Sequence, residues 1–225
     1  MNILSLEHLT HSYTERKLFD DADFYLHEGD KVGVIGINGT GKSTLLKIMA
    51  GLETPDEGQV IQASNLMIHY LPQNPEFSEE DTVLQSVQNM VHHHANENEL
   101  IAAKAMLTRL GITDFEQKTR ELSGGQRKRL ALVSVLITPC DVLIFDEPTN
   151  HLDSEMADWL ENKLQAFRGA LVMVTHDRYF LDSVTNKIIE LDKGKIYSYD
   201  EKYSGFLQRK AEREESVRAS ERKRQ

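Results

Sequence analysis

A glycine-rich phosphate loop carries the clearest chemistry in the chain. Gly36–Ser43 (GINGTGKS) fits the pattern G-x-x-x-x-G-K-[ST], and it lies between the apolar run Lys31–Ile35 and a helical pattern. In that context the loop turns its N–H groups toward a phosphate, and the helix start adds partial positive charge. We expect Lys42 to reach the β and γ phosphates and the Ser43 hydroxyl to ligate Mg²⁺. The residues expected to surround the phosphates are Gly36, Ile37, Asn38, Gly39, Thr40, Gly41, Lys42, Ser43 and Thr44.

Two adjacent acids follow a second apolar run. Asp141–Phe145 (DVLIF) is typical of a buried strand, and Asp146 and Glu147 come directly after it. Because Mg²⁺ prefers oxygen ligands and keeps several waters, we assign Asp146 to the metal, through water. Glu147 faces the other way and is the candidate to orient or deprotonate an attacking water. The alternative is that both are solvated loop acids.

Three further residues are candidates for the same site because these two motifs are present. His176 follows the buried run Ala170–Val174, whose parallel-strand pattern places its end at the ligand edge of a sheet. We therefore expect His176 to contact the γ phosphate. Gln73 follows a strand-like segment and is expected at Mg²⁺ or the attacking water, and Tyr13 is a candidate to stack on adenine. The alternatives are a structural histidine, an ordinary loop glutamine and an exposed tyrosine.

A second glycine pair opens a helix. Leu122–Gln126 (LSGGQ) precedes an apolar pattern that continues through Leu136, so Ser123 is expected near the helix start. Backbone N–H groups at a helix N-terminus form a phosphate site. The residues expected at this second phosphate site are Ser123, Gly124, Gly125 and Gln126.

In this order the motifs resemble those of the ATP-binding-cassette (ABC) superfamily over essentially the whole chain. Gly36–Ser43 is similar to Walker A and Asp146–Glu147 to the end of Walker B. The other matches are Tyr13 to the adenine-stacking loop, Gln73 to the Q-loop, Leu122–Gln126 to the signature, Leu152–Asp153 to the D-loop and His176 to the H-loop. The resemblance implies ATP and Mg²⁺ as cofactors, ATP hydrolysis to ADP and phosphate, and a nucleotide contact from Asp153.

Within the superfamily, Glu147–Asp153 (EPTNHLD) resembles the ABC-F proteins, which are soluble tandem-cassette ATPases that act on ribosomes. Leu18–Phe19 and Thr175–Asp182 agree with this, and Lys202–Glu214 resembles the start of the ABC-F inter-domain linker. The resemblance implies a translation factor or an antibiotic-resistance factor, with the ribosome and tRNA as partners. It does not separate these two roles.

The chain departs from ABC-F proteins in two respects. It carries one set of motifs, and 49 positions separate Gln73 from Leu122, too few for the long arm insertion of many first cassettes. In the superfamily the signature serves the phosphate loop of another cassette. The resemblance therefore implies a second cassette as partner, in the same full-length chain or in a head-to-tail homodimer. We expect the natural chain to continue past Gln225.

Composition supports a cytoplasmic protein without a membrane partner. No apolar run approaches the ~20 residues of a membrane-spanning helix, and the N-terminus lacks a signal-peptide pattern. The single cysteine, Cys140, implies no disulfide framework. The net charge is −10, with an excess of basic residues only in 202–225, which argues against broad nucleic-acid binding by the body. The run His92–His94 is a metal cluster or a set of solvated histidines at a helix end, and the second is favoured because no Cys or acidic partner is suitably spaced.

The patterns predict an α/β fold, a P-loop ATPase core with a mostly parallel sheet. Ile3–Leu9, Phe24–Leu26 and parts of Gln59–Leu71 alternate in polarity, which indicates an antiparallel β subdomain. A small helical subdomain is expected at about 79–122. We expect a nucleotide-binding domain over 1–201 and the start of a charged helical linker over 202–225.

Three functions fit these observations. The leading one is an ABC-F cassette that hydrolyses ATP on the ribosome. The alternative is the ATPase subunit of a membrane ABC transporter, which the NHLD sequence, the short helical subdomain and the basic tail disfavour. The third is a nucleotide-gated scaffold without turnover, against which the intact Glu147 and His176 argue.

Overall fold

The computed structural model describes residues 1–90 and 96–222, and it divides into two compact units. Unit 1 comprises Met1–Ala63 with Val174–Gln225, and unit 2 comprises Ser64–Met173. The run His92–His94, for which the sequence left open a metal cluster or a solvated helix end, lies outside the described residues.

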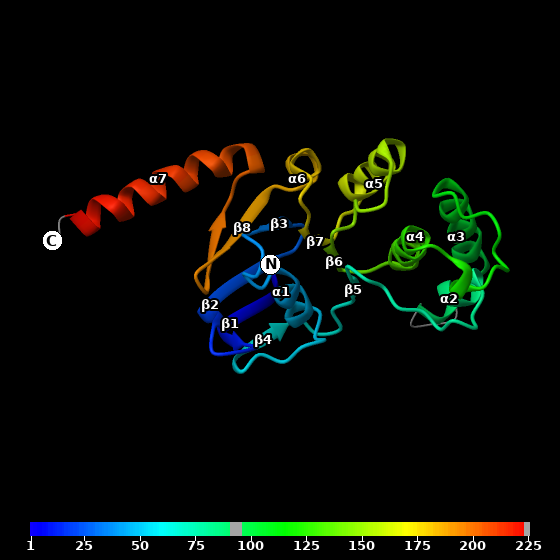
Figure 1. The fold of residues 1–225 in the computed structure, drawn as a ribbon, viewed down its shortest axis with the longest axis horizontal. Coiled ribbons are helices and arrows are strands. Elements are labelled where there is room, and N and C mark those ends of the chain that lie inside the picture. Colours follow the sequence, from blue (N-terminus) through cyan, green and yellow to red (C-terminus); the bar gives the residue numbers. More distant parts are fainter. Residues whose placement is uncertain (91–95, 223–225) are drawn as a thin grey trace. The chain divides into compact units, whose positions relative to one another are not determined.

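Unit 1 contains an antiparallel sheet of strands β1 (Asn2–Ser12), β2 (Lys17–His27) and β4 (Glu57–Gln62) in the order β2-β1-β4 (Figure 1). Alternate residues of β2 are buried, as expected for a strand with one face on the core. The antiparallel subdomain is therefore confirmed, with longer strands than the sequence predicted.

Unit 1 also holds the strands that lead to the phosphate loop. β3 (Lys31–Ile35) pairs in parallel with β8 (Lys187–Asp192), and β8 pairs with the antiparallel β9 (Lys195–Tyr199). Lys193 and Gly194 join β8 to β9 with positive φ angles of 47° and 80°, which suits a tight hairpin. Helix α1 (Lys42–Met49) follows the phosphate loop.

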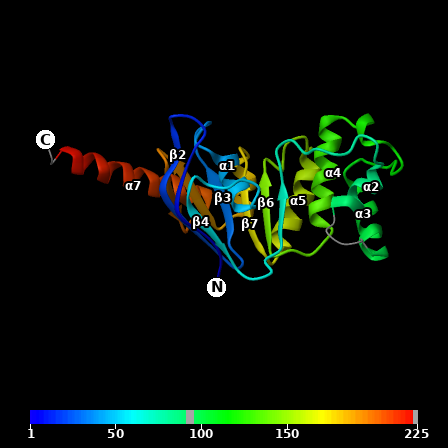
Figure 2. The same ribbon diagram turned by 90° about the horizontal axis from the view of Figure 1, so that it is seen from below.

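Two helices complete unit 1. The short helix α6 (Arg178–Val184) has Asp177 as N-cap, and α7 (Tyr203–Arg222) packs against α6 and β8. The buried Phe206 holds the first turns of α7 through an edge contact with Tyr199 at 5.1 Å. Most of the later residues of α7 are exposed, and both views show this end projecting beyond the strands of its unit (Figures 1 and 2).

Unit 2 contains β5 (Ile68–Leu71), β6 (Val142–Asp146) and all but the last residue of β7 (Ala170–Val174), in the order β5-β6-β7. All residues of β6 and β7 are buried, which is typical of strands covered on both faces. β5 pairs in parallel with β6, from Ile68 opposite Val142 to Leu71 opposite Phe145. Of the predicted segment Gln59–Leu71, the early part therefore belongs to the antiparallel sheet as β4, whereas the later part forms the parallel strand β5.

In the described residues of unit 2, the remaining elements are four α-helices and one 3₁₀ turn. α2 and α3 both pack against α4 (Figure 2). Their bounds are α2 Val83–Met90, α3 Glu97–Arg109, the 3₁₀ turn η1 Thr119–Glu121, α4 Gly124–Leu136 and α5 Ser154–Ala166. Asn96 caps α3 in a reciprocal capping box with Glu99. The α/β class with mostly parallel strands is confirmed.

Candidate functional site

The phosphate loop connects β3 to α1 in unit 1. Gly41 precedes α1 with a φ of 94°, and no side chain caps this helix. The first N–H groups of a helix have no partner within it, so this end suits an anion. The Lys42 ammonium donates to the carbonyl oxygens of Gly36 at 2.7 Å and Ile37 at 3.3 Å. Lys42 therefore lies against the backbone of the loop that precedes it.

The loop is closely packed on itself. Thr40 is buried, and its hydroxyl donates to the Ile37 carbonyl at 2.8 Å. A Cβ added to Gly36 would lie 2.6 Å from Thr40 Oγ1 and 3.0 Å from the Leu191 carbonyl oxygen. Only glycine fits there, and the compact loop with its uncapped helix and lysine matches the needs of a nucleotide phosphate.

One cavity of about 340 Å³ brings Lys42 and His176 together. Its walls include Gly36 and Ile37 of the phosphate loop, and His176 is exposed just after β7. The lining also includes Lys210 of α7, which forms an ion pair of 2.7 Å with the buried Glu190 of β8. The sequence indicated both expected residues but gave no sign that α7 lines the same cavity.

Tyr13 lies beside the phosphate-loop helix. Its hydroxyl donates to Glu53 at 2.7 Å and accepts from Thr44 at 3.2 Å, while its ring makes an edge contact with His11 at 5.2 Å. Burial, followed by the hydrogen bond to Glu53, raises the pKa of Tyr13 above its ordinary value. The side chain is nevertheless 59% exposed, so these contacts hold a ring that remains open to a base.

Replacing Tyr13 by alanine is expected to weaken ATP and GTP binding by similar factors, about 5- to 150-fold for a stacking loss of roughly 1–3 kcal/mol. Stacking depends on the π face of a base and not on its edges. Calorimetry with both nucleotides tests this, with Tyr13→Phe as the control that keeps the ring but loses the hydroxyl contacts. A change in the ATP:GTP preference above ~10-fold would instead indicate specific contacts to base edges.

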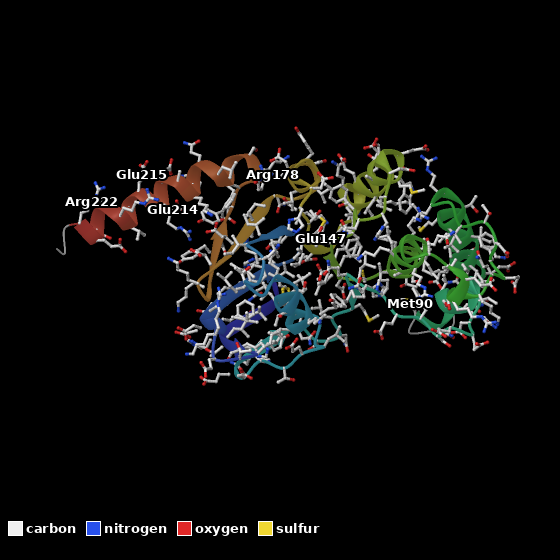
Figure 3. All side chains as sticks on the ribbon, in the orientation of Figure 1. Met90, Glu147, Arg178, Glu214, Glu215 and Arg222 are labelled. Carbon is white, nitrogen blue, oxygen red and sulfur yellow. The ribbon has the colours of Figure 1, made fainter. Side chains whose placement is uncertain are left out.

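In unit 2, Asp146 is the last residue of β6 and Glu147 follows it; Glu147 is labelled in Figure 3. Asp146 is 2% exposed and Glu147 is 5% exposed. Glu147 has a φ of 53°, a strained backbone for a non-glycine residue that costs on the order of 1–3 kcal/mol. Such strain is concentrated at functional sites, and burial shields both carboxylates from bulk water.

Lys128 on α4 was missed by the sequence reasoning. Its buried ammonium donates to the carbonyl oxygens of Pro72 at 2.7 Å, Gln73 at 3.2 Å and Asp146 at 2.8 Å. Burial lowers the pKa of Lys128 to about 8, against the opposing influence of the Asp146 and Glu147 carboxylates. Lys128 thus brings the segment of Gln73, whose side chain is exposed, to the end of β6.

The signature segment begins α4 as predicted. The Ser123 hydroxyl accepts from the Gln126 N–H at 3.1 Å, and the Gln126 side chain accepts from the Ser123 N–H at 2.9 Å. A Cβ added to Gly125 would lie 3.2 Å from the His151 side chain, whereas Gly124 has open space. Asp153 caps α5 by accepting from the Met156 N–H at 2.9 Å. Three of these side chains therefore have capping roles within the chain.

The predicted residues form two sets, one in each unit. Unit 1 carries Tyr13, Gly36, Ile37, Asn38, Gly39, Thr40, Gly41, Lys42, Ser43, Thr44 and His176. Unit 2 carries Gln73, Ser123, Gly124, Gly125, Gln126, Asp146, Glu147 and Asp153. Within the described residues, no cluster of three or more His, Cys, Asp or Glu side chains suits a metal ion. Ser43, Gln73 and Asp146 each carry a side-chain oxygen, the type of ligand that Mg²⁺ prefers.

A family model described as "ABC transporter" matches residues 19–150, which is more than half of the chain. The chain belongs to the ABC transporter family. It is accordingly an ATP-binding cassette, the domain that binds and hydrolyses ATP in that family.

Curated ABC proteins match nearly the whole chain. The "Uncharacterized ABC transporter ATP-binding protein YfmR" of Bacillus subtilis (strain 168) is 40% identical over 100% of this chain and 42% of that protein. The "Energy-dependent translational throttle protein EttA" of Escherichia coli (strain K12) is 35% identical over 93% of this chain and 45% of that protein. The chain thus spans less than half the length of these ABC relatives.

Solved ABC structures share the fold. The structure described as the ATP binding subunit of an ABC transporter has a TM-score of 0.78 at 21% identity, covering 88% of this chain and 90% of its own. The dimeric, post-hydrolysis structure of the cassette MJ0796 bound to ADP and Pi has a TM-score of 0.75 at 23% identity, covering 88% and 98%. In the part of the chain that the structure describes, no helix is long and apolar enough to cross a membrane.

Proposed function

We propose that this chain is an ATP-hydrolysing cassette of an ABC-F protein that acts on the ribosome together with a second cassette. The observation that carries the proposal is the 35% identity to the translational throttle protein EttA over 93% of the chain. The EPTNHLD sequence of Glu147–Asp153 supports the same subfamily. A role on the ribosome would place the protein in the cytoplasm.

In this proposal each predicted residue has a defined task. Lys42 and the N–H groups of the phosphate loop hold the β and γ phosphates, and Ser43, Gln73 and Asp146 serve as ligands of Mg²⁺. The bound metal supplies neutralisation of phosphate charge. Glu147 accepts a proton from the attacking water, and His176 orients the γ phosphate. The strained, buried backbone at Glu147 is the feature of the structure that best supports its part.

The remaining nucleotide contacts and the domain boundaries belong to the same proposal. Tyr13 stacks on adenine, and Asp153 and the signature residues Ser123–Gln126 act across a pair of cassettes. Residues 1–201 form the nucleotide-binding domain, with a helical subdomain at about 79–122. Residues 202–225 begin the linker to a second cassette. The exposed Glu215 and Arg222 on α7 suit a solvated linker helix (Figure 3).

Ribosome co-sedimentation tests the proposed partner. A chain carrying Glu147→Gln should pellet with purified ribosomes in ATP and less in ADP, because blocked hydrolysis keeps the ATP-bound state. Adding Lys42→Ala to the same chain is the control, since this variant keeps the Glu147 change but loses the nucleotide. Pelleting that is equal in ATP, in ADP and with the double variant would contradict a nucleotide-dependent ribosomal role.

A transporter ATPase is the second candidate, because the family model and the name of YfmR both refer to ABC transporters. Such a subunit needs a groove that accepts a helix from a membrane partner. Co-purification with a membrane protein, combined with no ribosome binding, would favour this candidate over the ribosomal one.

The need for a second cassette predicts that specific ATPase activity rises with protein concentration. Gly124 begins α4 at an exposed position where an added Cβ meets nothing within 4 Å. We expect Gly124→Arg to fold normally and to abolish the concentration-dependent activity, since the new side chain would block a partner's phosphate. Phosphate release measured across a protein dilution series checks both expectations.

Ser220→Arg on α7 is a matched control, because it adds the same side chain at an exposed site. It should leave the concentration dependence unchanged. Full activity that is independent of concentration, in a confirmed monomer, would contradict the shared site.

A further inference from the structure

One buried cation contacts two loops that the proposed mechanism uses. Lys128 is 3% exposed, and its ammonium has three hydrogen-bond acceptors, the carbonyl oxygens of Pro72, Gln73 and Asp146 at 2.7, 3.2 and 2.8 Å. A lysine ammonium has three donors, so this set uses all of them. The three acceptors belong to two segments, one after β5 and one at the end of β6.

The burial of the Lys128 ammonium costs free energy and therefore needs an explanation. Burying an ammonium carries a large desolvation penalty, which the hydrogen bonds to backbone carbonyls offset. Its neighbours on the same face of α4 are Ala131, Leu132 and Val135, all of them buried apolar residues. An apolar side chain would fill this face without the penalty, but it would leave three carbonyl oxygens without their donor.

We infer that Lys128 is a positioning residue for ATP hydrolysis, which fixes the backbone at Gln73 and Asp146 and ties both to the signature helix. The inference rests on the proposed function, since it presumes that these two residues serve the nucleotide. The Lys128 ammonium binds both segments through its single nitrogen atom. Because α4 begins at the signature and Lys128 lies one turn further along, a shift of this helix moves both segments together.

Lys128→Met tests the inference, because methionine is unbranched and apolar and suits a buried helix face. We expect turnover at saturating ATP to fall on the order of 10²-fold, the scale of a 1 Å misplacement of reacting groups. ATP affinity measured in EDTA should stay within about 2-fold of wild type, since the phosphate loop is unchanged. Lys128→Arg should recover part of the turnover, because it keeps the charge but has a rigid planar head.

Arg127→Met is the matched control at the preceding position of α4. Its guanidinium donates to the Arg120 carbonyl at 3.4 Å, and this hydrogen bond involves neither of the two segments. This variant should keep wild-type turnover. Amide hydrogen exchange provides a second readout, and in Lys128→Met it should rise at residues 73–74 and 146–147 without a matching rise in the antiparallel sheet.

The outcomes separate the inference from the proposed function. Wild-type turnover in Lys128→Met, an equal loss of ATP affinity and turnover, or a uniform rise in exchange would each overturn the positioning role. If the methionine variant fails to fold, Lys128→Gln, which keeps an amide donor, is measured in the same way. If the wild-type chain itself shows no hydrolysis at any concentration, the proposed function fails, while local exchange still decides the role of Lys128.

Discussion

ATP binding should be lost when Lys42 is replaced by alanine. The ammonium lies against the Gly36 and Ile37 carbonyls within the loop that matches a phosphate site. Removing one partner of a desolvated charge pair costs about 2–5 kcal/mol, so affinity should fall by roughly 30- to 5,000-fold. Calorimetry with ATP measures this directly.

Lys47→Ala is the matched control, because Lys47 is an exposed lysine in the last turn of the same helix. It should leave ATP affinity unchanged, and both variants should keep the melting temperature close to that of the wild type. Equal ATP affinity for Lys42→Ala and wild type would overturn the assignment of the phosphate loop.

The motifs of unit 1 could be located from the sequence because local backbone rules determine them. A buried strand, a loop with glycine at tight positions and an amphipathic helix occupy consecutive residues. The strand and helix that flank Gly36–Ser43 are therefore recognisable from the neighbouring sequence alone. The Ser123 start of α4 was predictable for the same reason, since its capping box involves only residues 123–126.

Strand pairing was harder to predict because it depends on distant residues. Ile68–Leu71 alternates in burial, which is also typical of an antiparallel strand, yet it pairs in parallel with β6, more than 70 positions further along the chain. Alternation shows which faces of a strand are buried, but it does not identify the neighbouring strand. The short helix α6 was also not predicted. Asp177, which caps its N-terminus, is the local signal in the sequence that indicates this helix.

Lys128 shows why part of the site could not be predicted. The sequence places a lysine on the same helix face as Ala131, Leu132 and Val135, which is a visible conflict between charge and apolar periodicity. Such a conflict often marks a functional position. However, Lys128 donates to the backbone carbonyls of Pro72, Gln73 and Asp146. Every residue has a backbone carbonyl, so the sequence does not show which of them accept from the lysine.

Hydrolysis should slow by ~10²-fold or more in Glu147→Gln, while ATP affinity is kept, because this is the usual scale for loss of a general base. Glutamine has nearly the same shape as glutamate, so it should fit the buried position at the end of β6. The amide cannot accept the proton of the attacking water. Phosphate release at saturating ATP and calorimetry on the same protein provide the two measurements.

Glu155→Gln in the first turn of α5 makes the same chemical change at an exposed position of the same unit. It removes only a surface ion pair with Arg109 and should leave turnover unchanged. If Glu147→Gln hydrolyses ATP at nearly the wild-type rate, Glu147 is not the base. If it loses ATP affinity as well as turnover, its buried carboxylate stabilises the end of β6, and the strained backbone there has a structural cause.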